Sequence, residues 1–286
     1  MNEKEILMRE PHLKSLIEDH HLSDDFIERH IGTLKRVYDS RKKCIGCKGL
    51  YMCSQSRPGE RLSLSYDGIL IREVEHCGYE KKKEAKKDFL DSFVYSDIPE
   101  TLSDLDLDNI GLEDASLQGL FIEVSDILDG KRDKGLYISG DLGVGKTYMC
   151  IALANSLVKK GKKTAFVKVS DFINELRRIV VTDTQRYDEL MRKLKDCEYL
   201  ILDDIGSESV SSFSRDDILF PILDYRMEHK LITLFTSNLN KSDLLKYYAY
   251  DKSNKSELMR AKRLTERIDI LTDAYVLQGR NKRREL

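Results

Sequence analysis

The sequence predicts an α/β protein whose main part is a parallel sheet flanked by helices, preceded by a small helical domain. Three observations lead to this prediction. Beyond residue 135, short apolar runs alternate with helix-length segments; a glycine-rich loop joins the first of these runs to a helical pattern; and the first 40 residues repeat apolar side chains at helical spacing. Strands separated by helices pair in parallel and bury both faces of their sheet.

Length and composition limit the class of protein. The 286 residues suffice for one large and one small domain, and 41% hydrophobic residues exclude a disordered chain. A net charge of −2 provides no overall attraction to nucleic acid or anionic lipid, so any polyanion site must be local. The first 20 residues lack the apolar core of a secretory signal, and no run approaches the ~18 apolar residues of a spanning helix. We therefore expect a cytoplasmic protein without a membrane partner.

Charge blocks divide the chain. A lysine-rich run at 81–87 is followed, from Asp88 to Gly130, by twelve acidic residues and no lysine or arginine. This shift predicts a small amino-terminal domain at 1–80, a linker at 81–97 and a main domain at 98–286. The lysine run within the linker also reads as the solvated face of a helix.

Individual elements follow from periodicity. Residues 1–40 are expected to form two or three amphipathic helices, and 62–75 alternate like a hairpin with its turn at Asp67 and Gly68. The expected strands of the main sheet are 136–139, 164–169, 199–204, 231–237 and 274–278.

Four of the six cysteines lie close together around the hairpin: Cys44, Cys47, Cys53 and Cys77. In a reducing compartment such a cluster favours metal over disulfides, and four thiolates suit tetrahedral Zn²⁺ in a structural role. His76 is the competing fourth ligand, and buried or redox thiols are the alternative to a metal site. Cys150 and Cys197 stand alone in apolar contexts and are expected to be buried.

A phosphate-binding loop is predicted at residues 140–147, which read GDLGVGKT and fit G-x-x-x-x-G-K-[ST]. Glycines let backbone N–H groups surround a phosphate, and the amino end of the following helix adds partial positive charge. Lys146 would reach the β- and γ-phosphate oxygens of ATP, and Thr147 would ligate Mg²⁺. The predicted nucleotide-binding residues of this loop are Gly140, Asp141, Leu142, Gly143, Val144, Gly145, Lys146, Thr147 and Tyr148.

Polar residues at the ends of two other expected strands complete the site. Asp203 and Asp204 end the run YLILDD, which we expect to neighbour the strand before the phosphate loop. Asp203 would hold Mg²⁺ through water, and Asp204 would polarise the attacking water. Asn238 follows LITLFTS and would contact the γ-phosphate or orient water; an ordinary turn or helix cap is the alternative.

Together these motifs resemble a known family. GDLGVGKT, YLILDDIG, RDDIL and YR within 215–226, FTSN and RLTERI are similar to the AAA+ ATPases of the bacterial replicative helicase loader group, the DnaC/DnaI/IstB-like ATPases. The resemblance covers about residues 98–286. It implies an AAA+ P-loop core with little or no helical lid, ATP hydrolysis, and self-association through nucleotide bound between subunits.

The resemblance also implies roles for particular residues. RLTERI would carry the arginine finger, which corresponds to Arg267, with Arg263 four residues earlier on the same helical face. Asp204 stands where most AAA+ enzymes have glutamate, and its shorter side chain suits a slow, switch-like ATPase; helicase loaders share this Asp-Asp pair. Without the resemblance, both arginines read as a solvated helix face.

A zinc-bearing amino-terminal domain on such an ATPase is similar to the DnaI-type primosomal loaders. In those proteins this domain docks on the hexameric replicative helicase, and a histidine often stands among the zinc ligands, so His76 stays open as a ligand. The expected function is ATP-dependent loading of that helicase onto single-stranded DNA during initiation or restart of replication. The alternatives are an IstB-like transposition helper ATPase and a non-hydrolysing nucleotide-gated adaptor.

DNA contacts are expected on the helical stretch between the second and third strands. It combines cations with an aromatic side chain, as grooves for single-stranded nucleic acid do, and the resemblance places DNA-tracking helices here. An amphipathic pair of helices without a ligand is the alternative. The candidate residues are Phe172, Arg177, Arg178, Arg192 and Lys193, and a basic cluster from Arg280 to Arg284 could add a second arginine to the nucleotide site or touch DNA.

Overall fold

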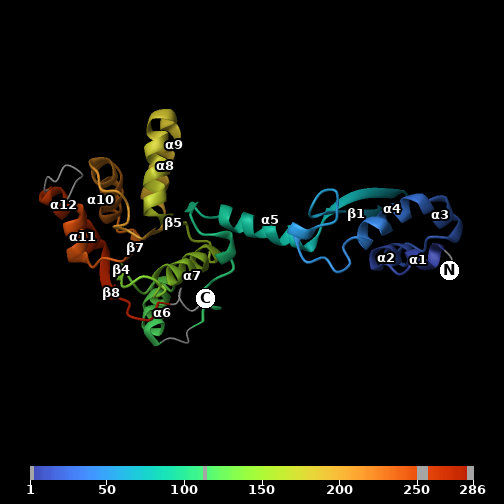
Figure 1. Cartoon of the computed structure of the whole chain (residues 1–286), viewed down its shortest axis with the longest axis horizontal. Helices are drawn as coiled ribbons and strands as arrows, with labels where there is room; N and C mark the ends of the chain where they lie inside the picture. Colours follow the sequence, from blue (N-terminus) through green and yellow to red (C-terminus); the bar gives the residue numbers. More distant parts are fainter. Residues whose placement is uncertain (1–2, 112–114, 250–256, 282–286) are drawn as a thin grey trace. The chain divides into compact units, whose positions relative to one another are not determined.

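The computed structural model describes residues 3–111, 115–249 and 257–281 (Figure 1). The chain divides into two compact units, Met1–Lys87 and Asp88–Leu286. This division falls inside the segment expected to be a linker, and much of that segment lies in the helix α5 (Gly78–Asp91), as the interpretation of the lysine run as a helix face predicts. Within the described ranges, no helix is long and apolar enough to cross a bilayer.

The amino-terminal unit packs four short helices against a two-stranded hairpin. Leu13, Leu34 and Val37 are fully buried between the helices, and Leu64 of the hairpin closes the core. The hairpin is antiparallel with Tyr66 opposite Leu70, as its alternating pattern predicts. The elements of the amino-terminal unit before α5 are α1 (Glu3–Leu7), α2 (Pro11–Asp19), α3 (Asp24–Arg29), α4 (Ile31–Lys42), the 3₁₀ helix η1 (Leu50–Met52), β1 (Glu60–Tyr66) and β2 (Leu70–His76).

The second unit is a six-stranded sheet in the order β3-β5-β6-β7-β4-β8, parallel throughout. All five strands expected from the sequence are present, and a two-residue edge strand, β3, adds to them without a sequence signal of its own. The strands are β3 (Tyr95–Ser96), β4 (Gly135–Ser139), β5 (Thr164–Lys168), β6 (Tyr199–Asp203), β7 (Ile232–Ser237) and β8 (Thr272–Val276).

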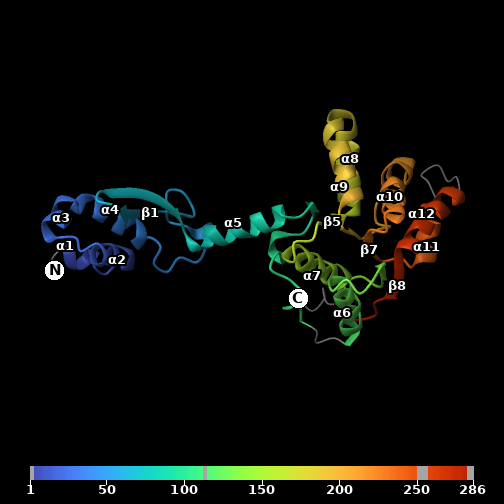
Figure 2. The same ribbon diagram turned by 180° about the vertical axis from the view of Figure 1, so that it is seen from behind.

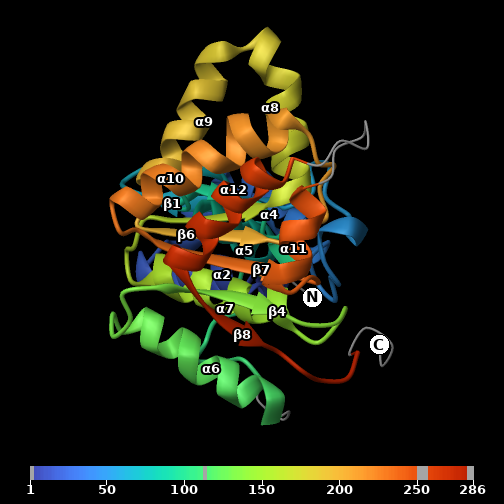
Figure 3. The same cartoon turned by 90° about the vertical axis from the view of Figure 1, so that its left-hand side faces the viewer.

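Helices cover both faces of this sheet, as Figure 3 shows. Leu136 and Ile138 of β4 face α6 and α7, whereas Tyr137 between them faces the opposite core. Successive side chains of β4 therefore pack into two separate cores, one on each face of the sheet. The helices of the unit are η2 (Glu100–Leu102), α6 (Ala115–Leu128), α7 (Lys146–Lys159), α8 (Val169–Thr182), α9 (Thr184–Asp196), the π-helix η3 (Phe213–Leu219), α10 (Phe220–Glu228), α11 (Lys241–Tyr248) and α12 (Leu258–Leu271).

Helices α8 and α9 form a hairpin that extends away from the sheet within this unit (Figure 2). Asp183 separates the two helices and caps α9, because its side chain accepts a hydrogen bond from the backbone N–H of Arg186 at 3.0 Å. At the base of the hairpin, Leu176 and Leu194 are fully buried. The hairpin is therefore anchored at its base.

Candidate nucleotide-binding and catalytic site

The predicted phosphate loop lies where β4 passes into α7, at the carboxyl ends of the parallel strands. Ligands of open α/β sheets bind at this edge, because the strand-to-helix loops cluster there. The expectation that Asp203 lies on the strand next to the loop strand is wrong in detail. β7 lies between β4 and β6, so Asp203 reaches the loop across one intervening strand.

The backbone of the loop has the conformation that its glycines permit. Gly143 has φ +79° and Gly145 has φ +107°, a left-handed region that side chains disfavour. Between them, Val144 is buried in the core beneath the loop, whereas Leu142 is exposed. The glycine spacing therefore supports a curled loop over the amino end of α7.

Lys146 is held inward against the loop. It is 7% exposed, and its ammonium donates to the carbonyl oxygens of Gly140 at 2.6 Å and Asp141 at 2.8 Å. A third hydrogen bond, of 2.9 Å, goes to Oδ1 of Asn238, 92 residues away in sequence. The site therefore brings together two of the predicted residues, Lys146 and Asn238, from different strand ends.

Asp203 and Thr147 meet directly. The Thr147 hydroxyl donates to Oδ1 of Asp203 at 2.8 Å, and the Thr236 hydroxyl donates to the same oxygen at 2.6 Å. Asp203 is 5% exposed, and burial raises the pKa of its carboxyl above the ordinary value, an effect that the two hydroxyls oppose. Thr236 stands at the same strand end as Asn238, which was the favoured candidate there, and this position was its one signal in the sequence.

Asp204 adopts a left-handed conformation with φ +58°, which is uncommon for a residue with a side chain. Its backbone N–H donates to the Thr236 hydroxyl at 2.9 Å, and its Oδ1 accepts from Nδ2 of Asn238 at 3.0 Å. Asn238 thus bridges Lys146 and Asp204. The Asn238 amide therefore holds the Lys146 ammonium and the Asp204 carboxylate near each other at the edge of the sheet.

The donor set at this edge fits Mg²⁺. Thr147 and Asp203 present a hydroxyl and a carboxylate oxygen side by side, and oxygen ligands of this kind are what Mg²⁺ prefers. Burial disfavours the ionised form of Asp203, and the positive charge of a bound cation would offset that cost. The chemistry that the metal supplies when bound is neutralisation of charge on the phosphate oxygens.

Arg267 lies on α12 and contacts none of these residues. Its Nε donates to Asp224 of α10 at 2.9 Å, and its Nη1 donates to Glu266 at 2.9 Å. The guanidinium groups of Arg263 and Arg267 lie 4.5 and 5.2 Å from the ring centroid of Phe220. The two arginines share a helix face, as their spacing predicts.

The four clustered cysteines are all half-buried and line one cavity of about 320 Å³ in the amino-terminal unit. None is in a disulfide. In the described part of the chain, no three His, Cys, Asp or Glu side chains stand close enough to form a metal cluster. His76 is not among the cavity-lining residues; its Nδ1 lies 2.8 Å from Glu84 instead.

Cys150 and Cys197 are buried, as expected, and burial raises the pKa of both thiols. Both therefore stay neutral thiols.

The expected DNA face needs one correction. Phe172 is 2% exposed and packs edge-on against Tyr95 with ring centroids 5.3 Å apart, so it cannot stack a base. Arg178 and Arg192 are exposed on α8 and α9, whereas Lys193 pairs with Glu189 at 2.8 Å and Arg177 lies over Phe213. Of the basic carboxyl-terminal cluster, Lys282, Arg283 and Arg284 lie outside the described residues.

Comparison with known proteins extends these observations. Residues 101–283 match the family model described as IstB-like ATP binding protein. The replicative helicase loader DnaI of Bacillus subtilis (strain 168) is 29% identical over 98% of this chain and 92% of its own length. The replicative helicase loader DnaC of Escherichia coli (strain K12) is 26% identical over 38% of this chain and 44% of its own. A crystal structure of DnaI, 29% identical, superposes with a TM-score of 0.55 over 68% of this chain and 98% of that one.

Proposed function

The chain belongs to the family of IstB-like ATP-binding proteins, and from this premise we propose that it loads the replicative DNA helicase onto single-stranded DNA in an ATP-dependent reaction. One observation carries the proposal. The family model matches residues 101–283, but the similarity to a helicase loader extends over 98% of the chain and so includes the amino-terminal unit. A transposition helper has no evident use for a helicase-docking unit.

The residues at the sheet edge support ATP binding followed by slow hydrolysis. The phosphate loop and Lys146 would hold the β- and γ-phosphates, and Lys146 would exchange its contacts with Gly140 and Asp141 for phosphate oxygens. Thr147 and Asp203 would hold Mg²⁺. Asp204, oriented by Asn238, would accept a proton from the attacking water while the amide holds the carboxylate in place.

We assign the trans-acting role to Arg267 and self-association to the ATPase unit. An arginine that reaches a neighbour's γ-phosphate stabilises charge that develops in the transition state. In the single chain Arg267 is 20% exposed and paired with Asp224, so it would exchange this carboxylate for a phosphate on assembly. Such an exchange makes hydrolysis depend on a neighbouring subunit.

Single-stranded DNA would follow the exposed cations of the α8–α9 hairpin. Arg178 and Arg192 are on separate helices of the hairpin and both are exposed, so each is accessible to a phosphate. Since Phe172 is buried, the expected contact is with the backbone rather than through base stacking. Binding of this kind is independent of sequence and weakens as salt rises.

The loading reaction can be tested with the full-length chain and the replicative helicase of the same organism. We expect the two proteins to co-purify, and we expect the helicase to appear on circular single-stranded DNA when ATP is present. A Lys146→Ala chain is the matched control, because it should retain the docking unit but fail to complete the transfer. No complex with the helicase, together with coating of duplex DNA, would favour a transposition helper. Loading without single-turnover hydrolysis would favour a non-hydrolysing adaptor.

We also propose a structural Zn²⁺ in the cavity lined by Cys44, Cys47, Cys53 and Cys77. The chemistry of the side chains supports this proposal, because the four thiols form no disulfides and line one cavity, and Nε2 of Gln55 donates to Sγ of Cys44 at 3.3 Å. The four cysteine side chains would hold the metal, and a bound Zn²⁺ would tie together the segments that carry them. A small domain with a limited core gains stability from such a site.

Metal analysis of the purified chain should find one zinc per chain. Cys53→Ser should lose the metal and destabilise the amino-terminal unit, because one of four thiolate ligands is gone. The control is His76→Ala, which should retain zinc, since His76 pairs with Glu84 and does not line the cavity. Loss of zinc from His76→Ala with retention in Cys53→Ser would show that the ligand set is wrong.

A further inference from the structure

The turn that carries Asp204 is held in place by several groups outside the P-loop. Asp204 has φ +58° and Gly206 has φ +89°, so two residues of one short turn are left-handed. Such conformations persist where the surroundings determine them. Thr236 and Ser237 of β7 hold the first half: the backbone N–H of Asp204 donates to the Thr236 hydroxyl at 2.9 Å, and Ser237 donates to the Ile205 carbonyl at 2.6 Å.

Glu208 holds the second half of the turn. Its Oε2 accepts the backbone N–H of Gly206 at 2.8 Å, and its Oε1 accepts the hydroxyl of Tyr248. The side chain is buried, with 2% exposure, and burial raises the pKa of its carboxyl. A buried carboxyl is costly unless hydrogen-bonded, and both oxygens here are engaged. No step in the hydrolysis described above uses this residue.

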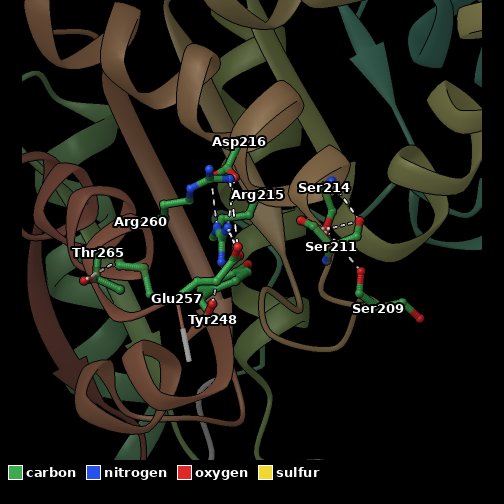
Figure 4. A network of polar contacts seen from close by, with 10 residues as sticks. Ser209, Ser211, Ser214, Arg215, Asp216, Tyr248, Glu257, Arg260 and Thr265 are labelled. Atoms are coloured by element: carbon green, nitrogen blue, oxygen red, sulfur yellow. Dashed lines mark hydrogen bonds and ion pairs between the residues drawn. The ribbon is translucent and has the colours of Figure 1, made fainter. Parts of the chain in front are cut away.

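Tyr248 is itself fixed from the other side. It is fully buried at the end of α11, and its carbonyl oxygen accepts from Nη1 of Arg215 at 2.9 Å. Figure 4 shows this network, in which the buried Arg215 guanidinium also pairs with Asp216 at 2.8 Å and with Glu257. Arg260 of α12 joins it through Asp216 at 3.0 Å. The partner of Glu208 is therefore anchored to the π-helix η3 and to the start of α12.

We propose that Glu208 is a positioning residue for Asp204: braced by Tyr248 and Arg215, it holds the Gly206 amide and so sets the direction of the Asp204 carboxylate. The inference rests on the proposed role of Asp204 in ATP hydrolysis. The two carboxylate oxygens of Glu208 bond the Gly206 amide and the Tyr248 hydroxyl, both outside the P-loop, so nucleotide binding should not depend on this residue. Its effect should appear in turnover alone.

The test compares two substitutions of similar length in the full-length chain. Glu208→Met fills the space but accepts no hydrogen bond, so the Gly206 amide loses its partner and the turn can relax. We expect single-turnover ATP hydrolysis to fall about 100-fold, the scale of a small misplacement of a reacting group, with the Kd for ATP within about 3-fold of wild type. Glu208→Gln keeps a carbonyl oxygen for Gly206 and an amide that can donate to the Tyr248 oxygen, so it should restore most of the turnover.

Several outcomes would overturn the proposal. Wild-type turnover in Glu208→Met would overturn it. A parallel loss of ATP affinity and turnover in both variants would also overturn it, because such a loss indicates a general packing role. If Glu208→Met does not fold, Tyr248→Phe tests the inference instead, because it removes the hydroxyl that donates to Glu208. We expect ATP turnover to fall in this variant while the affinity for ATP stays unchanged. Wild-type turnover in Tyr248→Phe would refute the inference. Asp204→Asn is measured alongside. Wild-type activity in that variant would refute the catalytic assignment itself, which is a distinct failure.

Discussion

Lys146→Ala should abolish Mg-ATP binding while leaving both units folded. Lys146 is held at the loop by hydrogen bonds to Gly140, Asp141 and Asn238, and its ammonium is the one P-loop group that carries a full positive charge to the phosphates. Hydrogen bonds to charged groups contribute about 1.5–3 kcal/mol each, so losing two of them weakens binding by at least about 100-fold. Titration with a fluorescent ATP analogue, together with zinc content, measures both parts of the prediction.

The matched control is Lys160→Ala, at the opposite end of the same helix. Lys160 pairs with Asp129 at 3.5 Å on the surface, and loss of such an exposed pair should leave ATP affinity unchanged. Unchanged ATP affinity in Lys146→Ala would remove the P-loop assignment. Loss of affinity in both variants would indicate a disturbed α7 rather than a missing ammonium.

Arg267→Ala should bind ATP normally yet hydrolyse it far more slowly in the assembled protein. The P-loop is untouched by the change, because Arg267 contacts Asp224, Glu266 and the Phe220 ring instead. An arginine acting across an interface contributes about 10³–10⁵ in rate. Mixing Arg267→Ala with Lys146→Ala should restore part of the activity, since some interfaces then combine bound nucleotide with an intact arginine.

Arg263→Ala is the control for this experiment, because Arg263 lies on the same face of α12 and over the same Phe220 ring. It should reproduce any loss caused by disturbed packing of α12 against α10. A wild-type rate of hydrolysis in Arg267→Ala would show that RLTERI carries no arginine finger and is a solvated helix face. A defect that mixing does not rescue would place Arg267 in its own subunit's site.

Local features of the fold were predictable, because they depend on neighbours in sequence. The hairpin, the five expected strands and the helix after the phosphate loop all follow from periodicity and turn residues within a short window. Missed features have weak local signals. The strand β3 has two residues, and η3 is a π-helix whose sequence, FSRDDIL, reads like an ordinary amphipathic helix. The expected linker at 81–97 is largely helical, in agreement with the interpretation of its lysine run as a solvated helix face.

The candidate site, by contrast, follows partly from the sequence and partly from the tertiary structure. The sequence by itself determined the phosphate loop, its glycines and the acidic pair after a buried strand, because steric and hydrogen-bonding demands on a short loop are written in adjacent residues. Only the tertiary structure decided that β7 lies between β4 and β6, which brings Asn238 between Lys146 and Asp204 across 92 and 34 residues of chain.

Burial was likewise decided in three dimensions. Phe172 looks available in a cationic helix, but the strand residue Tyr95 packs against its ring. The sequence places His76 beside Cys77, and only the tertiary structure places its Nδ1 2.8 Å from Glu84 on the next helix. Glu208 carries no motif, and its place under the Asp204 turn arises because Tyr248, 40 residues later, packs beside it. A side chain's environment depends on which distant elements pack together, and the free energy of that packing is summed over the whole core rather than over any one segment.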